Sequence, residues 1–205
     1  MKQKEIVLTL SILAEKGASE QELEDFEKWY PSGSATLSEV LSYLQILANT
    51  DTEYVKYVDC AKWLFDTFPP TQEPLVLNEL NREIIIYNGN LTIKANIAGD
   101  HVIIGNGDLN IEGDLNGCVE IWAKNVKAKN ITLDDLAEIE AETIDAENIM
   151  ADDYAEIVAE TIKAINIAAY GDSEIWAEKI NVQNIMDDTG TRIRGEINLI
   201  QHSYN

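Results

Sequence analysis

The sequence predicts an α+β fold class, in which a small N-terminal all-α helical domain precedes a single-stranded β-solenoid. Two observations support this prediction. Residues 1–68 carry apolar residues at helical spacing, whereas from residue 85 onward an isoleucine recurs at every eighteenth position. A unit of this length cannot bury its own apolar face, so about seven coils must stack to form a core. The column consists of Ile85, Ile103, Ile121, Ile139, Ile157, Ile175 and Ile193.

The change of period divides the chain into four parts. A helical bundle at 1–68 is expected to serve as an interaction or dimerisation domain, and residues 69–82, which begin with two prolines, form a linker and the N-terminal cap of the solenoid. The acidic β-solenoid then covers 83–200, and residues 201–205 form a tail.

Four helices are expected in the first part. The first begins near Ile6 and ends at Gly17, because glycine readily adopts the left-handed conformation that terminates helices. The other three each begin with a capping box, in which a Ser or Thr precedes a Glu by three residues. These pairs are Ser19–Glu22, Thr36–Glu39 and Thr50–Glu53.

The predicted coils change their internal pattern along the solenoid. In residues 83–118 the apolar positions are six apart, which is the spacing of a three-sided coil. Later coils show an Ile-x-Ala-x-x-Ile pattern, as at Ile139, Ala141 and Ile144. Residues two apart in a strand face the same way, so Ile and Ala both point inward. Two short sides and one longer side then total eighteen residues.

A column of asparagines provides a second indication of stacking. At an inter-strand distance of about 4.8 Å, their amides can form a hydrogen-bond ladder. A helix is the competing interpretation of the Ala- and Glu-rich coils, but apolar steps of five, five and eight do not line one helical face. The ladder is predicted at Asn130, Asn148, Asn166 and Asn184.

The predicted coils resemble those of β-solenoid repeat proteins over about residues 85–200. The early coils resemble hexapeptide repeats, the segment GDLNIEGDLNG at 107–117 is similar to bactofilin coils, and the later coils resemble pentapeptide repeats. In pentapeptide repeats the small residue lies two positions before the next large one, whereas here it lies three before. The resemblance implies a fold and no activity. It leaves handedness open, with a right-handed coil preferred.

The composition excludes several classes of partner. The net charge of −22 argues against direct binding to nucleic acid or to anionic membrane, which both require clustered Lys and Arg. The two cysteines, Cys60 and Cys118, have neither metal-ligand spacing nor a disulfide pattern, so we expect a reducing cytoplasm. No apolar stretch is long enough to span a bilayer.

Acidic residues fall in columns along the solenoid. Stacked like charges cost a few tenths to about 1 kcal/mol per pair, so the columns need a reason. They either form a solvated face that prevents aggregation or attract a basic site on a partner protein. Calcium binding at the corner aspartates is a third interpretation. The candidate partner-binding residues are Glu120, Glu138, Glu156, Glu174, Glu142, Glu160, Glu178, Asp134, Asp135, Asp152, Asp153, Asp187 and Asp188.

Outward apolar residues in the early coils form a second candidate surface. We expect the helical domain or a second subunit to cover it, because such a patch is rarely left bare. Trp176 lies further along the same stripe and is either a partner anchor or a cover for a gap between side chains. The other members are Ile84, Ile86, Val102, Ile104 and Trp122.

The sequence shows no catalytic constellation. His101 and His202 lack a matching Cys, Ser or Asp, and the acids repeat with the coils. We therefore expect no enzymatic activity, no cofactor and no metal.

The expected function is that of a non-enzymatic acidic binding protein. It would present its carboxylate columns to a basic partner, such as a nucleic-acid-binding enzyme, as a phage- or plasmid-type inhibitor that mimics nucleic acid. The alternative is a self-assembling scaffold or homodimer that pairs through the solenoid ends. A carbohydrate-active or calcium-binding solenoid is a second alternative.

Overall fold

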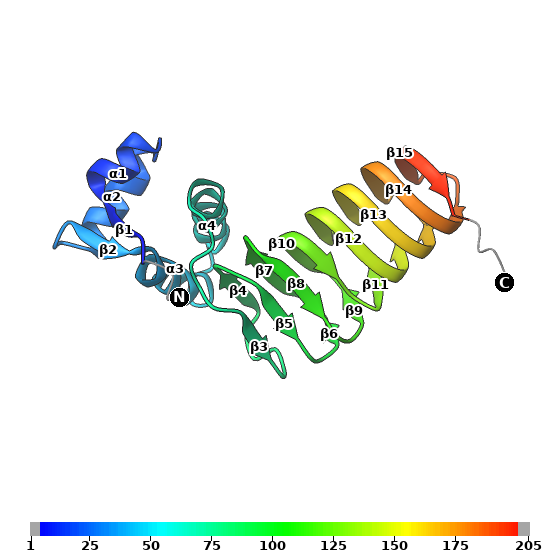
Figure 1. Cartoon of the computed structure of the whole chain (residues 1–205), viewed down its shortest axis with the longest axis horizontal. Helices are drawn as coiled ribbons and strands as arrows, with labels where there is room; N and C mark the ends of the chain where they lie inside the picture. The colour runs from blue at the N-terminus through cyan, green and yellow to red at the C-terminus, as the bar shows by residue number, and fades with distance from the viewer. Residues whose placement is uncertain (1–4, 201–205) are drawn as a thin grey trace.

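The computed structural model describes residues 5–200 and has four helices followed by a parallel β-solenoid of about seven turns (Figure 1). The predicted fold class is therefore confirmed. Figure 1 shows the coils stacked along the long axis of the molecule, with the helices gathered at one end. The predicted tail, 201–205, lies outside the described residues.

The helical half, residues 5–68, also contains a small antiparallel sheet. Its elements in chain order are β1 (Val7–Thr9), α1 (Leu10–Glu15), α2 (Glu20–Trp29), β2 (Ser34–Thr36), α3 (Leu37–Ala48) and α4 (Val55–Thr67).

Two of the three expected capping boxes are present. The Ser19 hydroxyl accepts a hydrogen bond from the backbone N–H of Glu22 at 3.2 Å, and the Glu22 carboxylate accepts one from the Ser19 N–H at 2.6 Å. Thr36 and Glu39 form the same reciprocal pair at the start of α3. Each box satisfies two backbone donors that a helix otherwise leaves unpaired.

The first helix is shorter than expected. It begins at Leu10, with Thr9 as its N-cap, because Val7–Thr9 instead forms strand β1 and pairs with β2. The β-branched residues Val7 and Thr9 favour a strand once a partner is present, and local periodicity cannot reveal that partner. The segment ends as predicted at Gly17, where φ is 90°.

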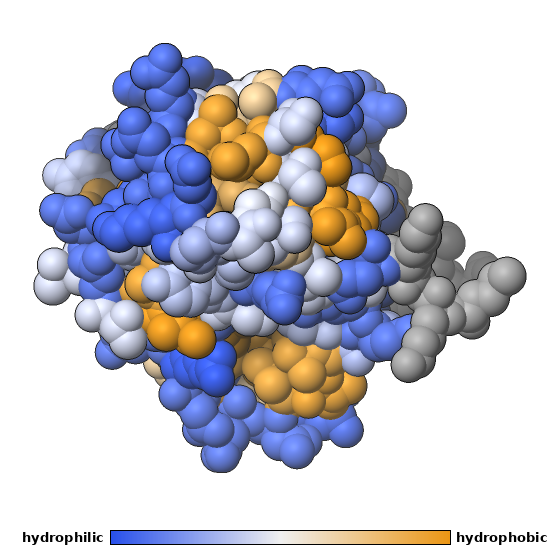
Figure 2. Space-filling view, turned by 90° about the vertical axis from the view of Figure 1, so that its left-hand side faces the viewer, coloured by the Kyte–Doolittle hydropathy of each residue, from blue (hydrophilic) through white to orange (hydrophobic). Residues whose placement is uncertain are grey.

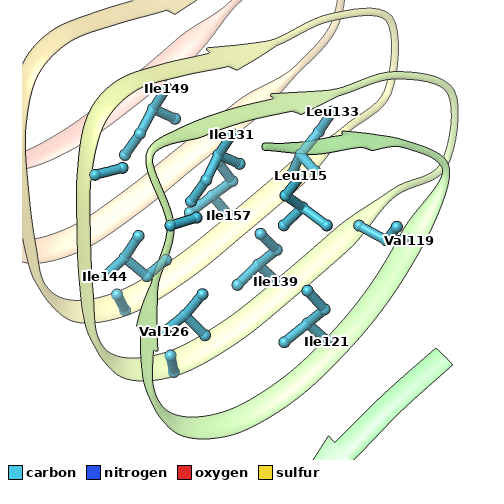
Figure 3. Close-up of a cluster of buried hydrophobic side chains, with 14 of the residues drawn as sticks. Leu115, Val119, Ile121, Val126, Ile131, Leu133, Ile139, Ile144, Ile149 and Ile157 are labelled. Carbon is cyan, nitrogen blue, oxygen red and sulfur yellow. The ribbon is translucent and has the colours of Figure 1, made fainter. Parts of the chain in front are cut away.

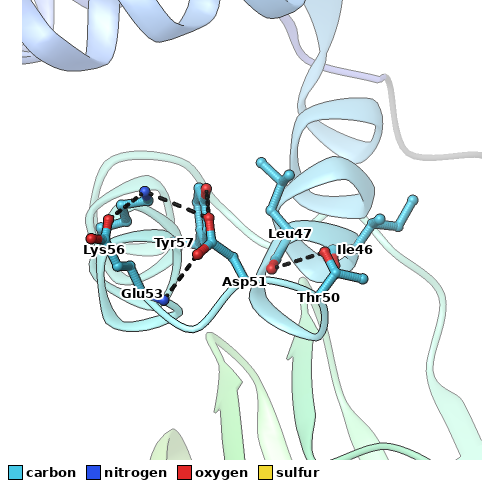
Figure 4. A network of polar contacts seen from close by, with 7 residues as sticks. All are labelled: Ile46, Leu47, Thr50, Asp51, Glu53, Lys56 and Tyr57. Atoms are coloured by element: carbon cyan, nitrogen blue, oxygen red, sulfur yellow. Dashed lines mark hydrogen bonds and ion pairs between the residues drawn. The ribbon is translucent and has the colours of Figure 1, made fainter.

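The third expected capping box, at Thr50 and Glu53, was wrong. The Thr50 hydroxyl donates a hydrogen bond back to the carbonyl of Leu47 at 3.3 Å, so it closes the end of α3 (Figure 4). Asp51 organises the turn instead, accepting hydrogen bonds from the Glu53 N–H at 3.0 Å and from the Tyr57 hydroxyl at 2.7 Å. Helix α4 then begins without a side-chain cap.

The solenoid contains thirteen strands in one parallel sheet system. The strands are β3 (Leu75–Leu77), β4 (Ile84–Tyr87), β5 (Leu91–Ile93), β6 (Ile97–Ala98), β7 (His101–Gly105), β8 (Asp108–Ile111), β9 (Leu115–Gly117), β10 (Val119–Lys127), β11 (Asn130–Leu133), β12 (Glu138–Ala151), β13 (Glu156–Ala169), β14 (Glu174–Asp187) and β15 (Arg192–Leu199). Strand β3 lies in the segment expected to be linker and cap, and it pairs with β5.

The predicted isoleucine column is continuous through the whole stack. Each member pairs with the next, from Ile85 on β4 to Ile193 on β15. Between these ends the isoleucines are almost completely buried. Figure 3 shows their side chains inside the coils, together with those of the other two sides. The core therefore runs along the axis of the stack.

The eighteen-residue period holds strictly on only one side of the coil. Leu109 pairs with Val126, seventeen residues on, and Leu115 pairs with Ile131, sixteen residues on. At this point two sides of the coil shorten from six residues to five. The loop around residues 134–137 is longer, so each coil still contains eighteen residues. Inward alanines such as Ala141 accommodate the tighter corners.

The predicted asparagine ladder is present on the outside of the stack. The amide nitrogens of Asn148, Asn166 and Asn184 each donate to the side-chain oxygen of the asparagine one coil earlier, at 2.6, 2.6 and 2.8 Å. Asn130 extends the ladder by donating to Asp114 at 2.7 Å. The ladder joins five consecutive coils, as expected of a structural column.

Helix α3 covers the N-terminal edge of the solenoid. The Gln45 side-chain amide donates to the Ile84 carbonyl at 2.6 Å and accepts from the Ile86 N–H at 2.8 Å. Asn49 contacts both backbone groups of Ile84, at 2.9 and 3.2 Å. These two amides take the place of a neighbouring strand, so the outer edge of β4 is not left open.

Candidate protein-binding surface

The first face of the solenoid is formed by β4, β7 and the first parts of β10, β12, β13, β14 and β15. Its outward side chains lie in two columns, of which the first changes from apolar to acidic to basic along the stack and the second stays mainly apolar until it ends at an arginine. One column is Ile84, Val102, Glu120, Glu138, Glu156, Glu174 and Arg192, and the other is Ile86, Ile104, Trp122, Glu140, Val158, Trp176 and Arg194.

The helical half covers the apolar beginning of this face. Ile84, Ile86 and Ile104 are buried in the core of the helical half, and Val102 is partly buried against it. Trp122 stacks on Phe65 of α4, with ring centroids 6.1 Å apart and planes 14° from parallel. We expected either the helical domain or a second subunit to cover this patch, and in the structure the helical half covers it.

Ion pairs occupy both ends of the glutamate column on this face. Lys62 of α4 binds Glu120 at 3.0 Å, so Glu120 belongs to the junction between the two halves. Arg192 pairs with Glu174 at the other end. Glu138 and Glu156 form no ion pair within residues 5–200.

The pKa of Glu138 shows the electrostatic consequence. Burial raises it above the usual glutamate value, and the neighbouring carboxylates, including Glu156, raise it further against the opposing effect of Lys62. The middle of the first face is therefore a site where negative charge is crowded and where a cation would be favoured.

A groove of about 400 Å³ lies beside α4 on the first face. Trp122, Val158 and Trp176 supply its apolar floor. Trp176 is 46% exposed, which is unusual for so large an apolar side chain. We refer to this feature as the Trp176 groove, and its acidic lining residues are Asp66, Glu140, Glu142 and Glu160.

The column Glu142, Glu160 and Glu178 follows the corner after the first face. All three side chains are exposed, and none forms an ion pair in the described part of the chain. Lys124 holds the matching position one coil earlier and lines the same groove. This column is therefore the part of the predicted acidic surface that is most available to a partner.

The corner aspartates have a structural role in the turns. Asp135 and Asp153 adopt φ of 53° and 54°, and Gly171 occupies the same place in the next coil with φ of 62°. Aspartate tolerates this left-handed conformation better than most residues do. The backbone carbonyls of Asp134 and Asp152 accept turn hydrogen bonds from the N–H three residues later, at 3.2 and 3.1 Å. The left-handed turn thus accounts for Asp135 and Asp153.

The expected placement of Asp187 in the same corner column was wrong. Asp187 pairs with Ala169 in the inward column that starts at Leu133, and it is exposed because the core ends there. Asp188 takes the place that Asp134 holds in its coil. An eighteen-residue period puts the corner positions of this coil at 188 and 189, so only Asp188 belongs to the corner column.

The second face, formed by the next part of each coil, is mixed in charge. Its central outward column reads Lys127, Asp145, Lys163 and Asn181. The second face therefore does not share the acidic excess of the first face.

The helical end carries scattered apolar residues. Val7, Ile46 and Val55 are exposed there. Figure 2 shows this end as largely hydrophilic, with apolar patches separated from one another. Isolated exposed apolar residues are normal on protein surfaces. The expected interaction or dimerisation role of residues 1–68 stays a prediction.

Residues 5–200 contain neither a metal-ligand cluster nor a membrane-spanning helix. No group of three or more His, Cys, Asp or Glu side chains there is arranged to hold a metal ion. Every helix in that range is too short or too polar to cross a bilayer.

Sequence reasoning missed the residues that join the two halves. Gln45, Asn49, Lys62 and Phe65 each contact a residue more than thirty positions away. Their helical spacing alone gives no signal of these partners.

Comparison of the chain with protein-family models, curated proteins and solved structures found no match.

Proposed function

We propose that this protein is a non-enzymatic binding protein that holds a basic segment of a partner protein in the Trp176 groove. The single observation that carries the proposal is the meeting of an exposed tryptophan with unpaired carboxylates at Glu142 and Glu160. Lysine and arginine side chains suit such a site, because their aliphatic stems pack on apolar surface while the charged heads reach carboxylates. An indole ring adds cation–π attraction.

The density of the acidic columns supports a partner that ordinarily binds nucleic acid. Coils repeat at about 4.8 Å, so two columns with one carboxylate per coil place one carboxylate per about 2.4 Å of stack. Duplex DNA carries one charge per about 1.7 Å of its axis, which is a density of the same order. The two columns are the glutamates from Glu138 to Glu174 and those from Glu142 to Glu178.

The proposal is tested with a triple charge reversal, Glu142→Lys, Glu160→Lys and Glu178→Lys. The matched control reverses three exposed acids of the helical half, Glu15, Glu24 and Glu27, and so changes the net charge equally. Proteins captured from a lysate are identified by mass spectrometry and purified. Their binding to each variant is then measured by calorimetry at low and at high salt.

The triple reversal should abolish binding, while the control retains it. Binding by the original protein should also weaken steeply as salt rises. Equal binding by the two variants would remove the proposal.

The self-assembling scaffold has weaker support. An open-ended filament needs uncovered strand edges at both ends of the solenoid, and at one end α3 covers the edge of β4 through Gln45 and Asn49. The carbohydrate-active and calcium-binding alternatives have no specific observation in their favour.

A further inference from the structure

The two ends of the solenoid differ. Amide side chains from α3 satisfy the outer edge of β4 at the N-terminal end. At the other end, β15 pairs with β14 along one edge, and its opposite edge has no partner within residues 5–200. An open edge of this kind is a template for pairing with another strand.

Apolar side chains accompany this open edge. Ile197 and Leu199 are 43 and 66% exposed, whereas Ile180 and Val182, which precede them in their columns, are fully buried. Ile197 continues the column of Ile180, which is fully buried one coil earlier. The core is thus exposed at this end, and burying it would be favourable.

We propose that the open edge of β15 pairs antiparallel with β15 of a second copy of this chain, about a two-fold axis at Gly195. The strand reads Arg-Ile-Arg-Gly-Glu-Ile-Asn over residues 192–198, and this segment is complementary to itself around the glycine. Pairing about Gly195 places Arg194 opposite Glu196 and Ile193 opposite Ile197.

The side-chain directions agree with this register. Ile193 and Ile197 both point inward, since they pair with the buried Ile175 and Ile180. Arg194 and Glu196 both point outward, because they continue the columns of the exposed residues Trp176 and Lys179. Directly opposite residues of an antiparallel pair lie on the same side of the sheet. Apolar therefore meets apolar, and opposite charges meet each other.

Neighbouring registers are less favourable. An axis at Ile193 would place Arg192 opposite Arg194 twice, which brings four like charges together. An axis at Ile197 would place Glu196 opposite Asn198 and lose the ion pairs. The axis at Gly195 forms the Arg194–Glu196 pair twice.

Gly195 also sits where the strand bends between the first and second faces. The register to β14 shifts by one residue here, and a Cβ on Gly195 would lie 1.9 Å from the carbonyl oxygen of Ala177. The bend makes the first face of one copy continue into the second face of the other. The assembly closes as a two-fold dimer, because the interface uses the same open edge of both copies.

The test measures the mass of the full chain by sedimentation and light scattering over a range of concentrations. The wild-type chain, whose mass is 22.9 kDa, should form a species of twice that mass. Arg194→Glu and Glu196→Arg should each raise the dimer dissociation constant by about tenfold or more, because each replaces two attractive pairs with two repulsive ones. Lys127→Glu, a charge reversal on the second face away from the edge, should have no effect.

Mixing the two single variants tests the register directly. A chain with glutamate at 194 and a chain with arginine at 196 have complementary edges, so their mixture should dimerise again, as should the double charge swap. A wild-type monomer at all concentrations, or a species that grows beyond a dimer, overturns the proposal. Failure of the mixture to recover the dimer overturns the register at Gly195. Circular dichroism of each variant checks that it folds.

Discussion

The side-chain amide of Gln45 donates a hydrogen bond of 2.6 Å to the backbone carbonyl of Ile84, and it acts as the peptide group of an absent strand. Its oxygen accepts from the Ile86 N–H at the same edge. One buried side chain of α3 therefore closes the outer edge of β4 and helps to hold the helical half against the solenoid.

The first prediction concerns this junction. Gln45→Leu should lower the free energy of unfolding by about 1 to 3 kcal/mol, because the Ile86 N–H would be buried without a partner. Urea denaturation followed by fluorescence measures the change. Gln183→Leu is the control, since Gln183 is only half-buried and should tolerate the substitution. Equal stability of the two variants would contradict the capping role.

The second prediction separates two tryptophans of the same column. Trp122→Ala should destabilise the protein by about 2 to 3 kcal/mol, below the usual range for fully buried aromatic residues, because it removes the stack on Phe65. Trp176→Ala should change stability by less than about 0.5 kcal/mol, since Trp176 is exposed. Thermal unfolding measures both.

Partner binding should show the opposite order under the proposed function. Trp176→Ala should weaken binding, because it removes the exposed aromatic floor of the groove. A stability loss for Trp176→Ala as large as that for Trp122→Ala would show that both residues serve packing.

The third prediction concerns the asparagine ladder. Asn148→Ala removes the hydrogen bonds to Asn130 and from Asn166. The loss should be about 1 to 2 kcal/mol, since each bond contributes about 0.5 to 1.5 kcal/mol. Asn181→Ala, outside the ladder, is the matched control and should be close to neutral. Chemical denaturation gives both values, and equal losses would exclude a stabilising ladder.

The fourth prediction concerns acid. The pKa of Glu39 is lowered by hydrogen bonds from the Thr36 backbone and hydroxyl, and that of Asp51 by the Glu53 backbone and the Tyr57 hydroxyl. A depressed pKa stabilises the fold above the unfolded pKa, and this contribution is lost as pH falls through the folded pKa. The helical half should therefore lose stability below about pH 4.

The contribution of Glu138 to stability depends on pH in the opposite direction. Because its pKa is raised in the folded protein, protonation favours the fold, and this contribution is present at low pH and lost as pH rises through the folded pKa. On acid titration, the circular dichroism of helices should disappear before that of strands. Simultaneous loss of both signals would contradict this order, and Glu39→Gln should reduce the acid sensitivity of the helices.

The repeat could be predicted from sequence because stacking requires it. Each coil covers the next, so inward positions such as Ile139 must repeat at the period of the coil, and Asn148 must meet its copies. A fixed period failed at Glu196, which pairs with Lys179 instead of continuing the column of Glu178. A bend at Gly195 shifts the register there, shortened sides shift it at Val126 and Ile131, and a fixed period cannot follow such changes.

The solenoid, its isoleucine core, its asparagine ladder and two capping boxes could be predicted from the sequence, because all of these depend on neighbours at a constant spacing. Tertiary structure alone decided that α3 ends the stack through Gln45, that α4 covers the early apolar patch, and that Trp176 and Glu160 line one groove. The physical reason is that these contacts join residues at unrelated separations along the chain. Their partners are selected by the shape and unpaired hydrogen-bonding groups of a surface that exists only after the coils have stacked.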